Sequence, residues 1–194
     1  MKREIAAFDF DGTLTISDSM FPFMKHVLGK KAFYLSVFKS LPWLIAYVFR
    51  CCPNWVAKQK LFSVCFAGKT IQDLEEKAIT FAKNNRKLLR QEKMDILKWH
   101  ILSGHQVYVI SASMEIWIRP FFDDISGICF LKTQPELSEG KLTGRFIGKN
   151  CYGIEKVERL KRVEPDREKY VLYAYGDSKG DDELLAWADY AFRE

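Results

Sequence analysis

The chain has 194 residues, of which 48% are apolar and 28% charged, a balance that allows a sizeable buried core and excludes a disordered or low-complexity protein. Its five cysteines are odd in number and show no C-x-x-C spacing, so we expect neither a disulfide framework nor a zinc site. The first residues contain no apolar leader and no cleavage site, and we therefore expect a cytoplasmic protein.

The first predicted element is an apolar strand that ends in two aspartates: residues 5–15 read Ile-Ala-Ala-Phe-Asp-Phe-Asp-Gly-Thr-Leu-Thr. Side chains two residues apart on an extended backbone point the same way, so Asp9 and Asp11 would project together from the carboxyl end of the strand. A divalent cation or a shared proton would relieve their repulsion, and such a pair can divide the roles of nucleophile and general acid. An ordinary Asp-Gly turn explains these residues equally well.

Residues 16–90 carry helix signals and no convincing strand pattern. Ser17 or Asp18 is the expected N-cap of a first helix, Gly29 ends it, and Thr70 caps a later one. We therefore predict an all-helical segment inserted after the first strand.

The most apolar part of this segment, residues 32–49, is interrupted by Lys39 and Pro42. Its longest run without charge, 40–49, is half of the roughly 20 residues that a membrane-spanning helix needs. We predict a buried or interfacial helix pair broken at Pro42, and contact with a membrane surface stays open.

Charge is divided unevenly along the chain. Residues 16–90 contain 13 Lys and Arg against 4 Asp and Glu, while the remainder contains 17 against 21. A basic helical module can attract an anionic substrate or an anionic lipid surface, although lysines that only keep helices soluble would look the same. No nucleic-acid-binding motif accompanies the charge, so we expect no nucleic-acid partner.

From residue 91 onward, predicted helices and strands alternate. We expect helices over 91–102, near 114–122, near 154–162 and over 181–187, strands at 106–111, 128–131 and 170–175, a loop or hairpin carrying Gly140 and Gly144, and a last apolar piece at 190–192. This alternation predicts an α/β fold with a doubly wound, Rossmann-like parallel sheet covered on both faces. We assign residues 1–15 and 91–194 to this core and 16–90 to a helical cap.

Ligands of such sheets bind beyond the carboxyl ends of the strands. One strand ends in Ser111-Ala112-Ser113, which offers a hydroxyl and backbone amides to a phosphate, or simply an N-cap. Another ends in Gly-Asp-Ser-Lys-Gly-Asp-Asp, residues 176–182, whose acids suit magnesium better than a turn. Lys156, at a predicted helix start, could add positive charge, with Lys149 as the fallback.

These motifs in this order resemble the four motifs of the haloacid dehalogenase superfamily across the whole chain. The helical insertion after the first motif is similar to the subfamily that contains phosphoserine phosphatase. Asp-Gly-Thr-Leu-Thr-x-x-Asp-Ser, Cys151-x-Gly-x-x-Lys156 and Gly-Asp-Ser look closer to a branch that includes bacterial phosphatidylglycerophosphatase C.

The resemblance implies a magnesium-dependent phosphomonoesterase. Asp9 would attack phosphorus and form an aspartyl phosphate, and Asp11 would act as acid and then base. It implies that Asp9, Asp11 through its backbone carbonyl, and Asp177 hold Mg²⁺, with Asp181 close by. Phosphate oxygens would bind Ser111, Lys156 and backbone amides, for which Phe10, Gly12 and Ala112 are the candidates.

The substrate pattern departs from the phosphoserine phosphatases. Asp18 stands where they carry a glutamate that reads the amino group, Lys58 and Lys60 stand near the expected arginine, and Gly180 replaces an asparagine. Lysine lacks the bidentate fork that arginine offers a carboxylate. We assign Asp18 and Lys60 to substrate binding and favour a lipid-linked or amphipathic phosphate.

Three alternatives stay open: a phosphoserine phosphatase-type enzyme acting on a small metabolite, a catalytically weak phosphate-binding or membrane-peripheral protein on the same fold, and a phosphotransferase. The oligomeric state is left unassigned.

Overall fold

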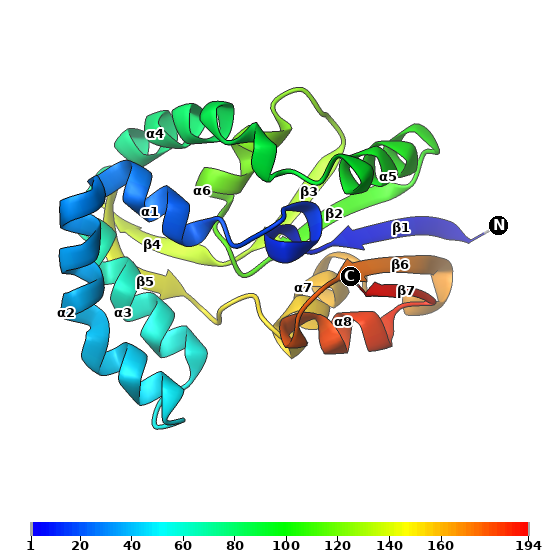
Figure 1. The fold of residues 1–194 in the computed structure, drawn as a ribbon. Coiled ribbons are helices and arrows are strands. Elements are labelled where there is room, and N and C mark those ends of the chain that lie inside the picture. The colour runs from blue at the N-terminus through cyan, green and yellow to red at the C-terminus, as the bar shows by residue number, and fades with distance from the viewer. Residues whose placement is uncertain (1, 194) are drawn as a thin grey trace.

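The computed structural model describes residues 2–193 and contains a five-stranded, all-parallel sheet in the order β3-β2-β1-β6-β7 (Figure 1). The strands are β1 (Arg3–Phe8), β2 (Gln106–Ser111), β3 (Ile128–Lys132), β6 (Tyr170–Gly176) and β7 (Tyr190–Arg193). The central β1 pairs with β2 on one side and β6 on the other, so the three carboxyl ends lie next to one another. The predicted doubly wound parallel sheet is confirmed.

Both faces of the sheet are buried, because successive residues of β1 point to opposite sides. Ala6 and Phe8 join an apolar cluster with α5 (Gln91–Leu102) and α6 (Glu115–Ile118). Ile5 and Ala7 join a second cluster with α7 (Ile154–Val163) and α8 (Asp182–Trp187). This two-sided burial explains why β1 reads as an unbroken apolar run, as strands of covered parallel sheets do.

Residues 16–90 form four helices. They are α1 (Met20–Leu28), α2 (Lys30–Val48), α3 (Asn54–Phe66) and α4 (Ile71–Asn84). Gly29 ends α1 with a positive φ of 76°, and the Thr70 side chain accepts a hydrogen bond from the Asp73 amide at 3.3 Å at the start of α4, as predicted.

Helix α2 corrects one expectation, because it runs as a single helix through Pro42 and the predicted break is wrong. Proline removes one backbone hydrogen bond from a helix interior. Here α2 packs against both α1 and α3, and these tertiary contacts offset the lost bond. Within residues 2–193, no helix is long and apolar enough to cross a membrane.

A hairpin from the second half of the chain, β4 (Gln134–Ser138) and β5 (Lys141–Ile147), packs against α3 rather than joining the main sheet. The Leu142 amide donates to the Lys69 carbonyl at 2.9 Å, and the Gly68 amide donates to the Leu142 carbonyl at 2.8 Å. The helices therefore fold together with a hairpin that lies 50 or more residues away in sequence. The division of the chain at residues 90 and 91 stays a prediction.

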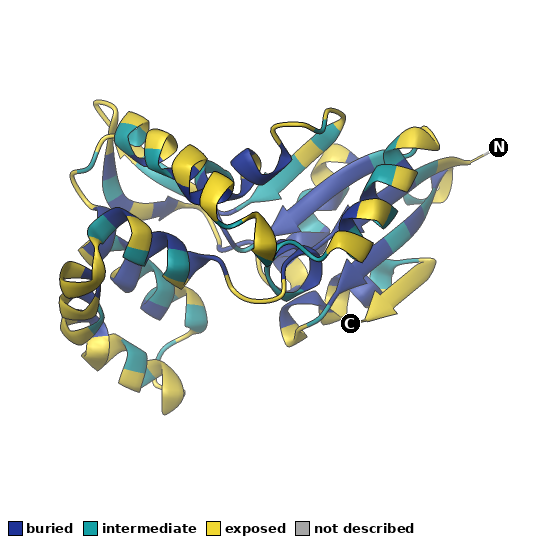
Figure 2. Ribbon diagram, turned by 45° about the horizontal axis from the view of Figure 1, so that its top comes forward, coloured by how far each residue is buried: buried dark blue, intermediate teal, exposed yellow. Residues whose placement is uncertain are grey.

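Aromatic packing ties the first and last of these helices to the core. Phe23 of α1 stacks on Trp117 of α6 with ring centroids 5.1 Å apart, and the indole of Trp117 donates to the Ser19 hydroxyl at 3.1 Å. Phe81 of α4 meets Phe121 edge-on. Figure 2 shows this buried interior continuing from the helices into the sheet, while the outer side of α2 is exposed.

Candidate active site

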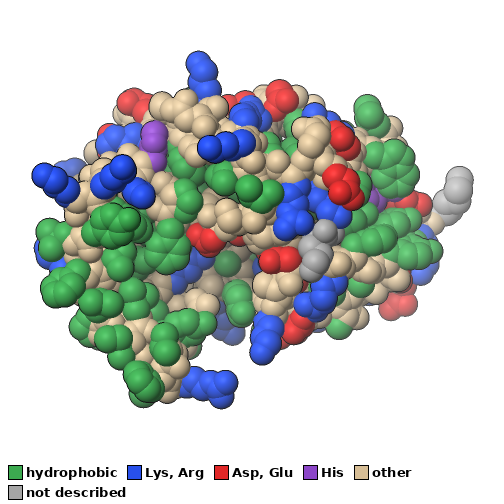
Figure 3. All heavy atoms as spheres, viewed as in Figure 1, with side chains coloured by type: hydrophobic (Ala, Val, Ile, Leu, Met, Phe, Trp, Pro, Cys, Tyr) green, Lys and Arg blue, Asp and Glu red, His purple; other side chains and the backbone are tan. Residues whose placement is uncertain are grey.

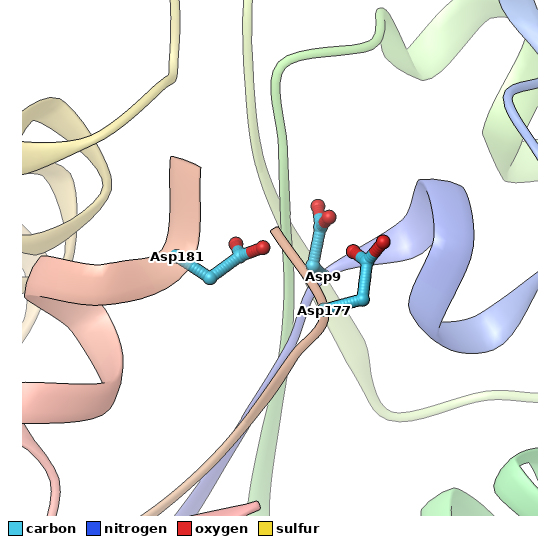
Figure 4. Close-up of side chains that lie close together, drawn as sticks. All are labelled: Asp9, Asp177 and Asp181. Atoms are coloured by element: carbon cyan, nitrogen blue, oxygen red, sulfur yellow. The ribbon is translucent and has the colours of Figure 1, made fainter. Parts of the chain in front are cut away.

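Three carboxylates converge at the carboxyl ends of β1 and β6. Asp9 follows β1, Asp177 follows β6, and Asp181 ends a short turn after it; one oxygen from each lies within 4.8 Å of the others. Figure 4 shows the carboxylates of Asp9 and Asp177 side by side, with Asp181 directed toward them from the neighbouring turn. Clustered carboxylate oxygens are the donors that Mg²⁺ prefers, so these residues fit the predicted cation.

Lys156, at the start of α7, is buried between two of these acids. Its Nζ lies 2.7 Å from Oδ1 of Asp9 and 2.5 Å from Oδ1 of Asp181. Burial by itself lowers the pKa of Lys156, but the two carboxylates outweigh it and hold the pKa above its ordinary value. The lysine therefore stays charged. The fallback, Lys149, is exposed on the loop before α7.

Asp181 has both of its oxygens engaged. Oδ1 accepts from Lys156, and Oδ2 accepts from the Ser178 amide at 3.1 Å and the Ser178 hydroxyl at 2.9 Å. The Asp177 carboxylate accepts a 3.3 Å hydrogen bond from the Thr13 hydroxyl, and Asp9 contacts Lys156 through Oδ1. Asp181 is thus placed to orient Lys156, and Asp9 and Asp177 to bind a cation directly.

Burial raises the pKa of Asp9 to about 7; Lys156 lowers this pKa and Asp181 raises it again. A bound cation would favour the ionised form of the carboxylate. The protonation state of Asp9 therefore depends on its burial, on Lys156 and Asp181, and on any bound cation.

Gly12 is required by the turn that follows Asp9. Its φ is 87°, a region that L side chains rarely adopt, and a Cβ there would lie 2.2 Å from Oδ2 of Asp177. The glycine thus lets the turn over Phe10–Leu14 approach the end of β6.

Asp11 is held apart from this cluster by two hydrogen bonds. Its Oδ1 accepts from the Ser19 amide at 2.7 Å and its Oδ2 accepts from the Ser113 hydroxyl at 2.5 Å. Burial and the nearby Asp18 raise the pKa of Asp11, and the bonds from Ser113 and Ser19 lower it in part. Sequence reasoning assigned no role to Ser113, although its position two residues after Ser111 was a usable signal.

These groups open into a cavity of about 640 Å³. The lining comes from the strand ends, from α1 to α3 and from the loop before α7, and comprises Asp9, Asp11, Gly12, Ile16, Ser17, Asp18, Met20, Phe21, Leu44, Tyr47, Asn54, Ala57, Lys58, Leu61, Arg90, Ser111, Ala112, Asn150, Tyr152, Lys156, Asp177, Ser178 and Gly180. Ser111 and Ala112 thus lie where the sequence placed them, and the Ser111 hydroxyl accepts from the Ser113 amide at 3.0 Å.

One predicted side chain, that of Lys60, does not reach the cavity, and Phe10 was predicted only for its backbone amide. The Phe10 side chain is fully buried and packs against Phe121 and Phe122. Lys60 is exposed, with Nζ 4.8 Å from the centre of the Trp43 ring. Residues two apart on an α-helix point about 200° apart around its axis, so Lys58 points into the cavity where Lys60 points outward.

Lys58 lines the cavity and donates to the Ala112 carbonyl at 2.8 Å, which links α3 to the end of β2. Burial lowers the pKa of Lys58, against the raising influence of Asp11 and Asp18. Asp18 also lines the cavity, but its Oδ1 accepts from the amides of Met20 and Phe21 and so caps α1.

Gly180, where an asparagine was the family expectation, makes room for an aromatic ring. A Cβ at this position would lie 2.4 Å from the ring of Tyr152, which lines the cavity.

Residues 6–186 match the family model described as haloacid dehalogenase-like hydrolase. The chain belongs to this family. The match spans the strand ends that carry Asp9 and Asp177 and the start of α7 that carries Lys156, and it confirms the superfamily and the hydrolase class predicted from the sequence.

Two relatives match nearly the whole chain. Protein CicA of Caulobacter vibrioides is 34% identical over 190 residues, which span 95% of this chain and 83% of the relative. A protein of Mycobacterium tuberculosis named "Probable phosphatase" is 26% identical over 203 residues, which span 94% and 66%.

Solved structures share the fold. A protein of unknown function from Bordetella pertussis has a TM-score of 0.82 at 21% identity, covering 96% of this chain and 87% of that one. A phosphoserine phosphatase carrying a phospho-aspartyl intermediate analogue has a TM-score of 0.59 at 18% identity, covering 97% and 84%.

Proposed function

We propose that this haloacid dehalogenase-like hydrolase is a magnesium-dependent phosphomonoesterase that works through an aspartyl phosphate on Asp9. The observation that carries the proposal is the pairing of Asp9 with Lys156 and Asp177 in a cavity where a second acid, Asp11, is held separately. The phospho-aspartyl analogue named for a phosphoserine phosphatase of the same fold supports it.

Asp9 is the nucleophile in this proposal. Its carboxylate oxygen attacks phosphorus as the bond to the leaving oxygen breaks. Asp9 reacts only when ionised, and Lys156 at 2.7 Å favours that form against the effect of burial. Mg²⁺ bound by Asp9 and Asp177 would neutralise charge on the phosphoryl group.

Asp11 is the acid and base. It protonates the leaving oxygen in the first step and takes a proton from the attacking water in the second, which breaks the Asp9–phosphorus bond and releases phosphate. Its raised pKa supports the acid role, and the bonds from Ser19 and Ser113 hold the carboxyl in place. The two aspartates of the first motif thus divide the chemistry because they have different neighbours.

The phosphoryl oxygens would bind the Ser111 hydroxyl and the backbone amides of the turns that begin at Phe10 and Ala112. Ser111 is buried at the end of β2 and lines the cavity. Such donors stabilise the charge that builds up on the equatorial oxygens in phosphoryl transfer.

For the substrate we propose an amphipathic phosphate, as in the phosphatidylglycerophosphatase C-like branch. Leu44 and Tyr47 of α2 line the same cavity as the acids, so an apolar group attached to the phosphate would have a surface to contact. Lys58 lines the cavity, and a lysine lacks the bidentate fork with which an arginine would hold the carboxylate of a small amino-acid phosphate.

The proposal is tested with p-nitrophenyl phosphate and Mg²⁺. We expect Asp9→Asn to lose activity by at least about a thousandfold, on the scale of removing a nucleophile. Asp123→Asn, an exposed aspartate outside the cavity, is the matched control and should keep full activity. Removing Mg²⁺ with a chelator should abolish turnover. Activity that survives Asp9→Asn would contradict the mechanism.

The substrate class needs a separate comparison. Phospholipid monoesters in mixed micelles should be hydrolysed with a higher kcat/KM than phosphoserine. The reverse order would favour the phosphoserine phosphatase-type alternative and would leave the assignment of Asp9 intact.

A further inference from the structure

Helix α2 has an inverted distribution of side chains. Its three buried residues are Phe33, Ser36 and Ser40. The two serine hydroxyls donate to carbonyls of the same helix, Ser36 to Ala32 at 2.9 Å and Ser40 to Ser36 at 2.8 Å, so burial leaves them satisfied. The side that faces the protein therefore carries two small polar residues beside a single phenylalanine.

The opposite side of α2 is apolar. It carries a continuous stripe, which we call the α2 face, with the spacing of one side of a helix: Tyr34, Phe38, Leu41, Ile45 and Val48. These side chains are exposed, Phe38 to 68% and Val48 to 74%. Figure 3 shows the hydrophobic side chains gathered over α2, with lysine and arginine at the margins. Monomeric soluble proteins rarely expose a contiguous patch of this kind without a partner.

The segment of sequence that carries the α2 face has charges of one sign. Residues 19–72 contain no Asp or Glu and eight basic residues, namely Lys25, Lys30, Lys31, Lys39, Arg50, Lys58, Lys60 and Lys69. A second copy of this chain would bring the same positive charge to the interface and be repelled. An anionic surface would be attracted.

Aromatic residues with polar edges are also exposed on α2 and at the start of α3. Trp43 is half exposed and lies under the ammonium of Lys60, and Tyr47 and Trp55 are also exposed. Tryptophan and tyrosine favour the boundary between water and hydrocarbon because their rings have an apolar body and a polar edge.

We propose that helix α2 docks this protein on an anionic lipid bilayer, with the α2 face in the headgroup and upper acyl region and the lysines against lipid phosphates. The sequence left contact with a membrane surface undecided, and this proposal assigns the contact to the α2 face. The proposed membrane binding does not depend on the proposed catalytic activity.

A second step rests on the proposed function. Leu44 and Tyr47, which line the catalytic cavity, belong to the same helix as the docking stripe. Docking would therefore hold the helix that forms part of the cavity wall at the lipid surface.

Cosedimentation with vesicles tests the docking. The probes are vesicles of equal parts phosphatidylcholine and phosphatidylglycerol, and vesicles of phosphatidylcholine alone. The wild-type protein should bind the anionic vesicles and lose binding as salt is raised. The double variant Phe38→Ser/Val48→Ser should weaken binding about tenfold or more. Leu102→Ser/Val163→Ser is the matched control, since both residues are exposed and apolar but belong to α5 and α7.

Charge-reversal variants separate the electrostatic contribution to docking from the apolar one. Lys39→Glu on α2 should weaken binding to the anionic vesicles, and Lys87→Glu, exposed outside residues 19–72, should not. No binding to anionic vesicles, equal binding by the Phe38/Val48 variant and wild type, or self-association that this variant abolishes would each overturn the proposal. Hydrolysis of p-nitrophenyl phosphate by the same variant should be unchanged, which distinguishes failed docking from failed catalysis.

Discussion

The acidic strand ends and the outer side of α2 depart from the usual distribution of side chains in opposite directions. At the strand ends Asp9, Asp181 and Lys156 are almost wholly buried, whereas on α2 residues such as Phe38 and Val48 stand in water. Buried charge is costly unless paired, and exposed apolar surface contributes nothing to the core. Both regions are therefore places where folding stability alone does not account for the residues present.

The largest expected effect breaks the buried charge network. Lys156→Met leaves Asp9 and Asp181 buried without their cation, and we expect a loss of roughly 3–5 kcal/mol in the free energy of unfolding. Urea unfolding checks this, and phosphatase activity should fall with it. Lys149→Met, an exposed lysine on the preceding loop, is the control and should leave both unchanged. A small stability change would mean that the two carboxylates take up protons at little cost.

Gly12→Ala tests the close approach at the site rather than its charge. The new methyl would collide with the Asp177 carboxylate, so we expect activity to fall about a hundredfold, as displaced catalytic groups commonly cause. Gly68→Ala is a matched control because its φ of 81° is similar and nothing lies within 4 Å. Both variants should lose about 1 kcal/mol of stability from the backbone conformation. Equal activity in the two would contradict the proposed contact.

His100 is a buried ionisable group that lies outside the catalytic cavity. Its Nε2 lies 2.9 Å from the Tyr175 hydroxyl, and its Nδ1 lies 2.7 Å from Nδ1 of His105, which in turn pairs with Glu4. Burial, aided by His105, lowers the pKa of His100 to about 4.

The direction of the pH effect on stability follows from the difference in proton binding between the unfolded and the folded chain. The unfolded chain binds a proton at His100 near its ordinary pKa of 6.5 and the folded chain does not, so this contribution to stability is present above that pH and is lost as pH falls toward 4. We expect a loss of about 2 kcal/mol between pH 7 and pH 5 that His100→Gln removes and His26→Gln does not. Urea unfolding at several pH values measures this loss. An equal change in the free energy of unfolding with pH for wild type and His100→Gln would refute the assignment.

The smallest effect is expected on α2. Phe38→Ser/Val48→Ser should change the free energy of unfolding by no more than about 0.5 kcal/mol, because exposed side chains have little contact to lose. Thermal or urea unfolding in the absence of lipid measures it. A loss well above 1 kcal/mol would show that these side chains pack in the free protein, and would weaken the contrast with the strand ends.

The match between sequence and structure was closest where local geometry decides the outcome. A strand that ends in Asp9 places its next residues at the sheet edge whatever the rest of the chain does, and a threonine at position 70 caps a helix through its own hydroxyl. The same reasoning brought Ser111, Lys156 and Asp177 to one cavity, because parallel strands all end on one side of the sheet.

Other features depended on partners distant in sequence. Pro42 suggested a broken helix, but packing against α1 and α3 keeps α2 whole. Residues Lys58 and Lys60 are both lysines of α3, and only the orientation of α3 against β2 places Lys58 at the Ala112 carbonyl.

The sequence alone determined the parallel α/β core, the acids at its strand ends and the basic, apolar character of residues 19–72, since these depend on periodicity, spacing and composition. Only the tertiary structure decided that Asp11 is bound by Ser113, that a hairpin at 134–147 completes the helical segment, and that the apolar side of α2 faces outward. Which face of a helix is buried depends on the shapes it packs against, and no local pattern contains that information.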